Sequence, residues 1–232
     1  MKQKAFRAAF PLTFPVFIGY IFLGIAFGIL SGSSGFHVGW AFLMSLLIYA
    51  GSMQFVTVPL LLAPYHFLST VLLTLMVNAR HLFYGLAMLN RYKDCGKLKP
   101  YLIFSLTDET YSLVCSTEPP EDVSRKWFFF FISALNHFYW VLGSVIGALV
   151  GNFLPINTTG IDFSMTALFV VILLDQVLSH PKAAGRCAVT GLLAGIICLF
   201  IFGSGNFLLP ALIITVLFVT AFAQAERRKE LP

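Results

Sequence analysis

The sequence predicts an all-α polytopic membrane protein, and the composition and the apolar runs are the two observations behind this prediction. Hydrophobic residues make up 58% of the 232 residues and charged residues 11%, whereas roughly a quarter of the residues in soluble domains are charged. The mean hydropathy is +0.86. Several apolar runs reach the length of about 20 residues that a helix needs to cross a hydrocarbon core. The connecting segments are too short for a second domain, so we expect residues 1–232 to form one integral-membrane domain.

The chain begins with the basic stretch MKQKAFRAAF, which is followed by an apolar run. This order superficially resembles a signal peptide, but no small-x-small cleavage site ends the run at the expected length. We therefore expect a retained first helix whose basic start is cytoplasmic. The net charge of +5 does not indicate nucleic-acid binding, because the basic residues lie at the ends of apolar runs, where they set orientation and contact lipid.

Eight apolar segments can be assigned, and their loops favour two alternative topologies. The segments are residues 11–30, 39–63, 67–90, 100–115, 127–150, 163–178, 187–203 and 206–224. Eight full spans would place both termini in the cytoplasm but the basic loop RYKDCGKLK outside, against the positive-inside rule. A bundle of six full spans plus two broken or re-entrant segments would keep both termini and every basic cluster cytoplasmic. The sequence leaves both topologies open.

The two segments that can enter the membrane and return are 39–63 and 100–115. Ala50-Gly51-Ser52-Met53-Gln54 lies in the middle of the first, and Thr107-Asp108-Glu109-Thr110 lies in the middle of the second. Non-helical backbone is tolerated at membrane depth only where it lines a cavity or is buried in protein. We therefore expect a helix break at each of these stretches.

Arg80 lies in the middle of an apolar segment, within VNARHLFYGL. At 1.5 Å per residue it is about 15 to 20 Å from either end of that segment, too far for its side chain to reach water. An arginine at the bilayer centre costs about 2.5 to 3.5 kcal/mol on insertion scales, so it should face the protein interior and have a partner. Asp108 and Glu109 are the expected partners.

Adjacent residues on a helix point about 100° apart, so one of the two carboxylates can pair with Arg80 while the other faces elsewhere. A carboxyl group in a dry site can take up a proton near neutral pH, which would suit coupling to a proton gradient. His81 is a candidate second proton carrier. The alternative is that the ion pair only fixes the helix register.

Gln54 and the break at Gly51 suggest a site for an amino acid. The half-helix beginning near Met53 would favour an anion such as a carboxylate. A zwitterionic amino acid also needs a carboxylate for its ammonium group and an apolar pocket for its side chain, and the sequence contains all three elements.

Two further patterns concern packing. Small residues recur four apart and allow helices to approach closely, although glycine is also simply frequent in membrane helices; they are Gly24 and Gly28, then Gly143, Gly147 and Gly151, then Gly191 and Gly195. Trp127 followed by Phe128 to Phe131 is typical of an interfacial aromatic belt.

The order AGSMQF at 50–55, NARHLFY at 78–84 and TDETY at 107–111 resembles the AzlC family of bacterial branched-chain amino acid permeases, the azaleucine-resistance proteins. The resemblance implies export of valine, leucine and isoleucine, in some members methionine, across the inner membrane. It also implies a small hydrophobic partner of the AzlD type. With this resemblance, residues 1–232 are expected to be one transport domain, in which substrate binding or coupling is assigned to Gly51, Gln54, Asn78, Arg80, His81, Tyr84, Asp108 and Glu109.

Other functional classes have less support. A channel is one alternative, but no ring-forming repeat or row of like charges lines an obvious pore. A structural subunit of a membrane complex is another, but it is hard to reconcile with three buried ionisable groups. Gly32-Ser33-Ser34-Gly35 matches the GxSG of intramembrane serine proteases, but it lies in a glycine-serine loop, so we expect no enzyme. No metal or cofactor is expected either, because the cysteines lack metal-binding spacing.

Overall fold

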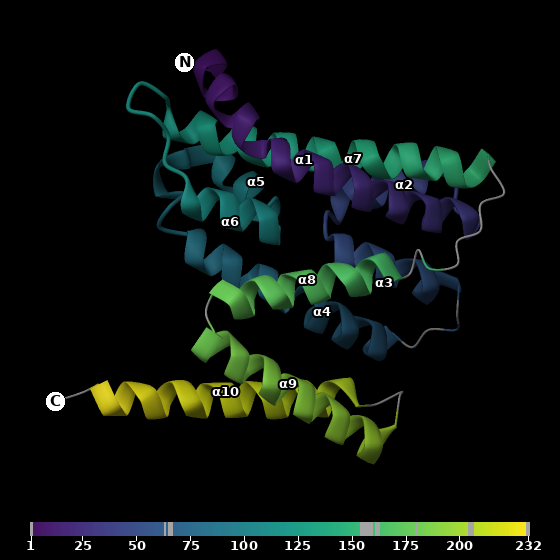
Figure 1. The fold of residues 1–232 in the computed structure, drawn as a ribbon. Helices are drawn as coiled ribbons and strands as arrows, with labels where there is room; N and C mark the ends of the chain where they lie inside the picture. The colour runs from purple at the N-terminus through teal and green to yellow at the C-terminus, as the bar shows by residue number, and fades with distance from the viewer. Residues whose placement is uncertain are drawn as a thin grey trace. The chain divides into compact units, whose positions relative to one another are not determined.

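The computed structural model describes residues 2–62, 64, 67–153, 160, 163–179, 181–203 and 207–230, and their regular elements are all helical (Figure 1). The chain divides into two compact units, Met1–Met165 and Thr166–Pro232. The second unit contains most of α8 (Phe163–Ser179), together with α9 (Pro181–Phe202) and α10 (Leu208–Glu230).

Three helices in the described ranges are long and apolar enough to cross a membrane: Lys2–Ser33, Arg125–Phe153 and Ala184–Phe202. The first of these, α1 (Lys2–Ser33), starts well before the apolar run at residue 11 and continues through Pro11 and Pro15. It ends in the GSSG motif, where Ser33 donates a hydrogen bond to the Leu30 carbonyl and Gly35 has a φ of 86°. This motif is therefore a helix-ending turn.

The first unit is built around close packing of α1 against α7 (Arg125–Phe153). A Cβ atom added to Gly24 would lie 3.0 Å from the Ser144 backbone nitrogen, and one added to Gly151 would lie 2.7 Å from the Ile29 carbonyl oxygen. The glycines of these two helices therefore let backbone meet backbone, as their spacing predicted.

The third glycine pair is not packed in this way. A Cβ atom added to Gly195 would meet nothing within 4 Å in the part of the chain that the structure describes, and one added to Gly191 would make only an ordinary contact. The high frequency of glycine in membrane helices accounts for this pair.

Both segments expected to break are broken. Residues 39–63 form α2 (Val38–Leu47) and α3 (Gly51–Leu62), and residues 100–115 form α5 (Lys99–Phe104) and α6 (Asp108–Ser116). In the first break the left-handed residue is Tyr49, with a φ of 47°, so the unwound stretch lies just before Gly51 rather than at it. Accordingly α3 starts at Gly51, two residues before the expected start near Met53.

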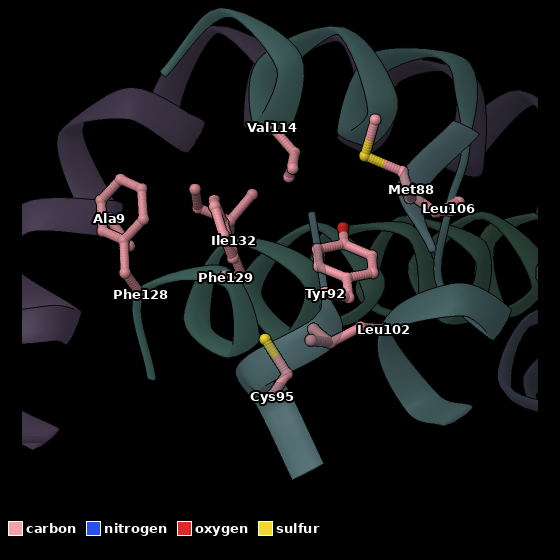
Figure 2. Close-up of a cluster of buried hydrophobic side chains, with 10 residues drawn as sticks. All are labelled: Ala9, Met88, Tyr92, Cys95, Leu102, Leu106, Val114, Phe128, Phe129 and Ile132. Carbon is pink, nitrogen blue, oxygen red and sulfur yellow. The ribbon is translucent and has the colours of Figure 1, made fainter. Parts of the chain in front are cut away.

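The basic loop at 91–99 is anchored to the protein interior by a short 3-10 helix, η1 (Lys93–Leu98). Tyr92 and Cys95 are buried in a cluster with Phe128 and Phe129 of α7 (Figure 2). Phe128 and Phe129 are fully buried, so the interpretation of this aromatic run as an interfacial belt is wrong for these two residues. Their side chains attach the loop to α7 instead.

Candidate functional site

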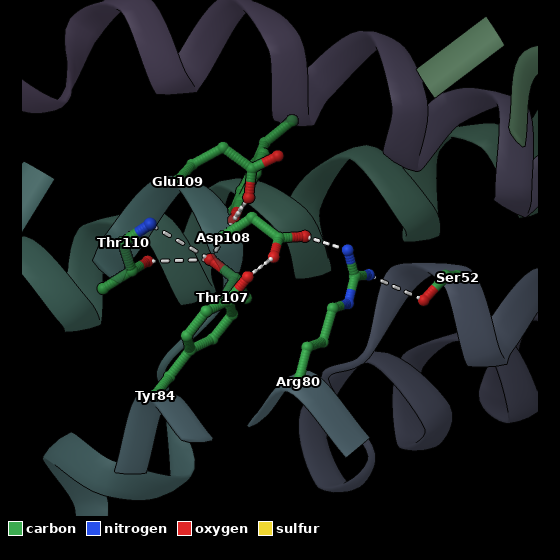
Figure 3. Close-up of polar contacts among 8 residues, drawn as sticks. Ser52, Arg80, Tyr84, Thr107, Asp108, Glu109 and Thr110 are labelled. Carbon is green, nitrogen blue, oxygen red and sulfur yellow. Dashed lines mark hydrogen bonds and ion pairs between the residues drawn. The ribbon is translucent and has the colours of Figure 1, made fainter. Parts of the chain in front are cut away.

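Arg80, on α4 (Phe67–Met88), bridges the two helix breaks (Figure 3). One terminal nitrogen of its guanidinium forms an ion pair with Asp108, the first residue of α6. The other donates a hydrogen bond of 2.9 Å to the Ser52 hydroxyl, on the second residue of α3. The amino ends of two half-helices, distant in sequence, therefore meet at one guanidinium group, which we call the Arg80 bridge.

Asp108 is held from several directions. Tyr84, one turn after Arg80 on α4, donates a hydrogen bond of 2.5 Å to the other carboxylate oxygen of Asp108, and its ring stacks on Tyr111 with centroids 4.5 Å apart. The position of Asp108 at the start of α6 adds the favourable interaction of an anion with a helix amino end. About a fifth of the Asp108 side chain and a quarter of the Arg80 side chain are exposed.

Glu109 faces a different set of partners. The Tyr20 hydroxyl, on α1, donates a hydrogen bond of 2.7 Å to the Glu109 carboxylate. Tyr20 is also within hydrogen-bonding distance of the Thr107 hydroxyl, which donates to the Thr110 hydroxyl at 3.0 Å. The two adjacent acids thus diverge, as their angular separation predicted: one carboxylate faces a guanidinium group and the other a chain of neutral hydroxyl groups.

Gln54 is fully buried and both ends of its amide are hydrogen-bonded. Its amide nitrogen donates to the Ser45 hydroxyl at 3.0 Å, and its carbonyl oxygen accepts from the Trp140 indole at 2.8 Å. A Cβ atom added to Gly51 would lie 2.8 Å from the Trp140 ring. Gln54 and Gly51 therefore hold the first break against α7 in this structure.

The two remaining α4 residues lie close to the bridge in sequence. The His81 ring meets the Tyr84 ring edge-on at 6.1 Å between centroids. The side-chain oxygen of Asn78 is buried and accepts no hydrogen bond from any residue in the described ranges. Asn78 also lines a cavity between α3 and α4.

Sequence reasoning missed Tyr20, Ser45 and Trp140, which connect α1, α2 and α7 to the predicted site residues. Each is a hydrogen-bonding side chain within an apolar run, but single tyrosine, serine and tryptophan residues are too common in membrane helices to stand out. Within the described ranges, no group of three or more His, Cys, Asp or Glu side chains has the arrangement of a metal site.

Comparison of the sequence with known proteins identifies its family. Residues 15–154 match the AzlC protein family. The chain belongs to the AzlC family. The matched range includes the Arg80 bridge, both broken segments and α7 as far as Phe153, and it ends before α8.

Individual bacterial proteins are similar to this chain over most of its length. The Bacillus subtilis branched-chain amino acid transport protein AzlC is 46% identical over 90% of this chain and 82% of its own length. A Helicobacter pylori membrane protein (strain 26695) is 42% identical, over 94% of this chain and 95% of its own length. The inner membrane protein YgaZ of Escherichia coli is 30% identical over 78% of this chain and 77% of its own. No solved structure matches. With these relatives and its apolar helices, the chain is a multi-pass membrane protein.

Proposed function

We propose that this AzlC-family chain is a secondary transporter that exports branched-chain amino acids across the bacterial inner membrane. The proposed substrates are valine, leucine and isoleucine, with methionine as a further candidate. The proposal includes one transport domain over residues 1–232, with cytoplasmic termini and six full spans plus the two broken segments as re-entrant elements. It also includes a small AzlD-type subunit as partner. The similarity to the Bacillus subtilis branched-chain amino acid transport protein AzlC supports the substrate class.

The observation that carries the proposal is the meeting of two broken helices at Arg80. Substrate sites of secondary transporters lie where discontinuous helices expose half-helix ends near the bilayer midplane. Asp108 and the Arg80 guanidinium together offer both charges that a zwitterionic amino acid requires, and both side chains are partly accessible. In this proposal the bridge opens when substrate replaces its internal contacts.

Glu109 is the residue we assign to proton coupling. Its partner Tyr20 carries a neutral hydroxyl group, which can donate to a carboxylate and can also accept from a carboxylic acid. Asp108 instead forms the ion pair with the Arg80 guanidinium group. Glu109 can therefore bind and release a proton without taking a partner from a buried cation, while Asp108 stabilises the Arg80 bridge. His81 is the candidate for passing the proton on.

Amino-acid release from cells that express the chain with and without an AzlD-type partner, measured for all twenty amino acids, tests the proposal. We expect release of valine, leucine and isoleucine to rise only when both subunits are present, to saturate with internal concentration and to depend on the proton gradient. Glu109→Gln should remove the dependence on the gradient. Release equal to that of cells without the chain would refute transport, and release that fails to saturate would indicate a channel.

A further inference from the structure

A cavity of about 450 Å³ lies between α3 and α4. On the α3 side it is lined by Met53, Thr57, Leu60 and Leu61, whose spacing places them on one face of that helix. Met53 follows directly after Ser52, the residue that contacts Arg80. The lining on α3 therefore begins one residue after the Arg80 bridge.

The α4 side of the cavity is a stripe of polar residues four apart, Thr70, Thr74 and Asn78. The Thr74 hydroxyl donates to the Thr70 carbonyl oxygen at 2.8 Å, and across the cavity the Thr57 hydroxyl donates to the Met53 carbonyl oxygen at 2.7 Å. Because these two hydroxyl protons are used within their own helices, Thr57 and Thr74 need no acceptor from a ligand. This part of the lining suits a small aliphatic group.

Asn78 is the exception among the lining residues. Its side-chain oxygen is buried and has no hydrogen-bond partner in the described part of the chain, although buried acceptors are nearly always satisfied. Because Asn78 lines the cavity, a small rotation of its side chain would let a ligand with a donor group, such as an ammonium group, satisfy this oxygen. The cavity thus combines an aliphatic compartment with one acceptor.

We propose that this cavity binds the substrate itself, with the branched aliphatic side chain between α3 and α4 and one proton of the ammonium group donated to Asn78, which leaves its other two protons for Asp108. This inference rests on the proposed transport function and adds the location and the size limit of the side-chain pocket. The volume lies in the lower part of the range of about 300 to 1,000 Å³ that is usual for small-molecule sites. The lining residues carry no ring and no charge, which favours aliphatic over aromatic or charged substrates.

Two substitutions with opposite effects on the cavity test the proposal. Thr57→Leu fills the pocket, and Leu60→Ala enlarges it. In Thr57→Leu the ratio of leucine to valine transported should fall roughly tenfold or more, because one methylene-sized group changes the preference of an apolar pocket between two substrates by that factor. In Leu60→Ala the ratio of methionine to valine transported should rise by a similar factor. Asn78→Leu should raise KM for all three substrates without changing their ratios.

The matched control is Thr220→Leu, because Thr220 makes the same bond within its helix on α10 and does not line the cavity. Opposite shifts of the two ratios cannot result from misfolding, which lowers transport of all substrates together. Unchanged ratios in both variants that still transport would overturn the pocket assignment and indicate that a lipid chain or a protein partner fills the cavity. Absence of amino-acid transport by the unmodified chain with its partner would instead refute the proposed function.

Discussion

Replacing Asp108 by asparagine should destabilise the protein far more than replacing its neighbour Glu109 by glutamine. Removing one partner of a buried ion pair costs about 3–5 kcal/mol. The side chains of Arg80 and Asp108 are 25% and 18% exposed, so we reduce this range to about 2–4 kcal/mol for partial access to solvent. Loss of the anion at the start of α6 adds about 0.5 kcal/mol. The expected destabilisation of Asp108→Asn is therefore about 3.5 kcal/mol.

Thermal unfolding of the purified protein in detergent measures this difference. A loss of 1 kcal/mol lowers Tm by about 2–4 °C in a chain of this size, so Asp108→Asn should lower Tm by about 7–14 °C. Glu109→Gln keeps an acceptor for the Tyr20 hydroxyl and should cost less than about 1 kcal/mol. Equal Tm values for Asp108→Asn and the unmodified protein would refute the assignment of different roles to the two acids.

Asp122→Asn is the matched control for this comparison. Asp122 accepts a hydrogen bond of 2.7 Å from Lys4, and more than half of each side chain is exposed. The hydrogen bond and the charge of Lys4 lower the pKa of Asp122. Because the pKa of Asp122 is lower in the folded state, its ion pair with Lys4 stabilises the fold at any pH above that at which free aspartate titrates. This stabilisation is lost as the pH falls through the lowered pKa. At neutral pH it is fully present, and removing so exposed a pair should leave Tm nearly unchanged.

Three further outcomes can be measured. Gly147→Val should lower Tm by several degrees, because the valine side chain would overlap an α1 carbonyl oxygen and overpacking costs about 1–3 kcal/mol. Gly19→Ala, with open space around the added methyl group, should leave Tm unchanged. Equal effects of the two substitutions would contradict the close contact between the helices. Trp140→Phe should cost about 1–3 kcal/mol in the same assay by leaving Gln54 without its donor, and an unchanged Tm would show that this bond adds nothing. Burial raises the pKa of the Cys95 thiol. In a variant whose only cysteine is Cys95, maleimide should therefore label the folded protein slowly at pH 7 and the protein in SDS rapidly. Fast labelling of the folded protein would contradict the burial of Cys95.

The helix breaks and the Arg80 pair could be predicted because a membrane makes polar residues conspicuous. A glycine-serine stretch and two adjacent acids interrupt apolar segments, and an arginine that cannot reach water needs a carboxylate. The free-energy cost of placing these residues in a membrane indicated where the helices break and that Arg80 pairs with a carboxylate. That Asp108 rather than Glu109 pairs with Arg80 depends on how α6 faces α4, which local sequence does not determine.

The structure differs most from prediction where burial depends on packing between distant segments. Phe128 and Phe129 follow two basic residues and have the composition of an interfacial belt, yet they are buried against Tyr92 and Cys95 of the 91–99 loop. Gln54 was expected at an open binding site, and its amide is instead satisfied by Trp140, which lies 86 positions later in the chain. In both cases the partner lies on an element that no local pattern connects to the residue.

The glycine contact between α1 and α7 has a consequence for the biosynthesis of the chain. Ser33 ends α1 and Arg125 begins α7, so 92 positions separate the two helices (125 − 33). At about 5–20 residues per second, translation of that interval takes roughly 5–20 s. During this time α1 has been synthesised, but α7, the helix that it packs against, has not. Chains interrupted before α7 would expose the glycine face of α1 to lipid or to other nascent helices, so the packing of α1 depends on completed synthesis of α7.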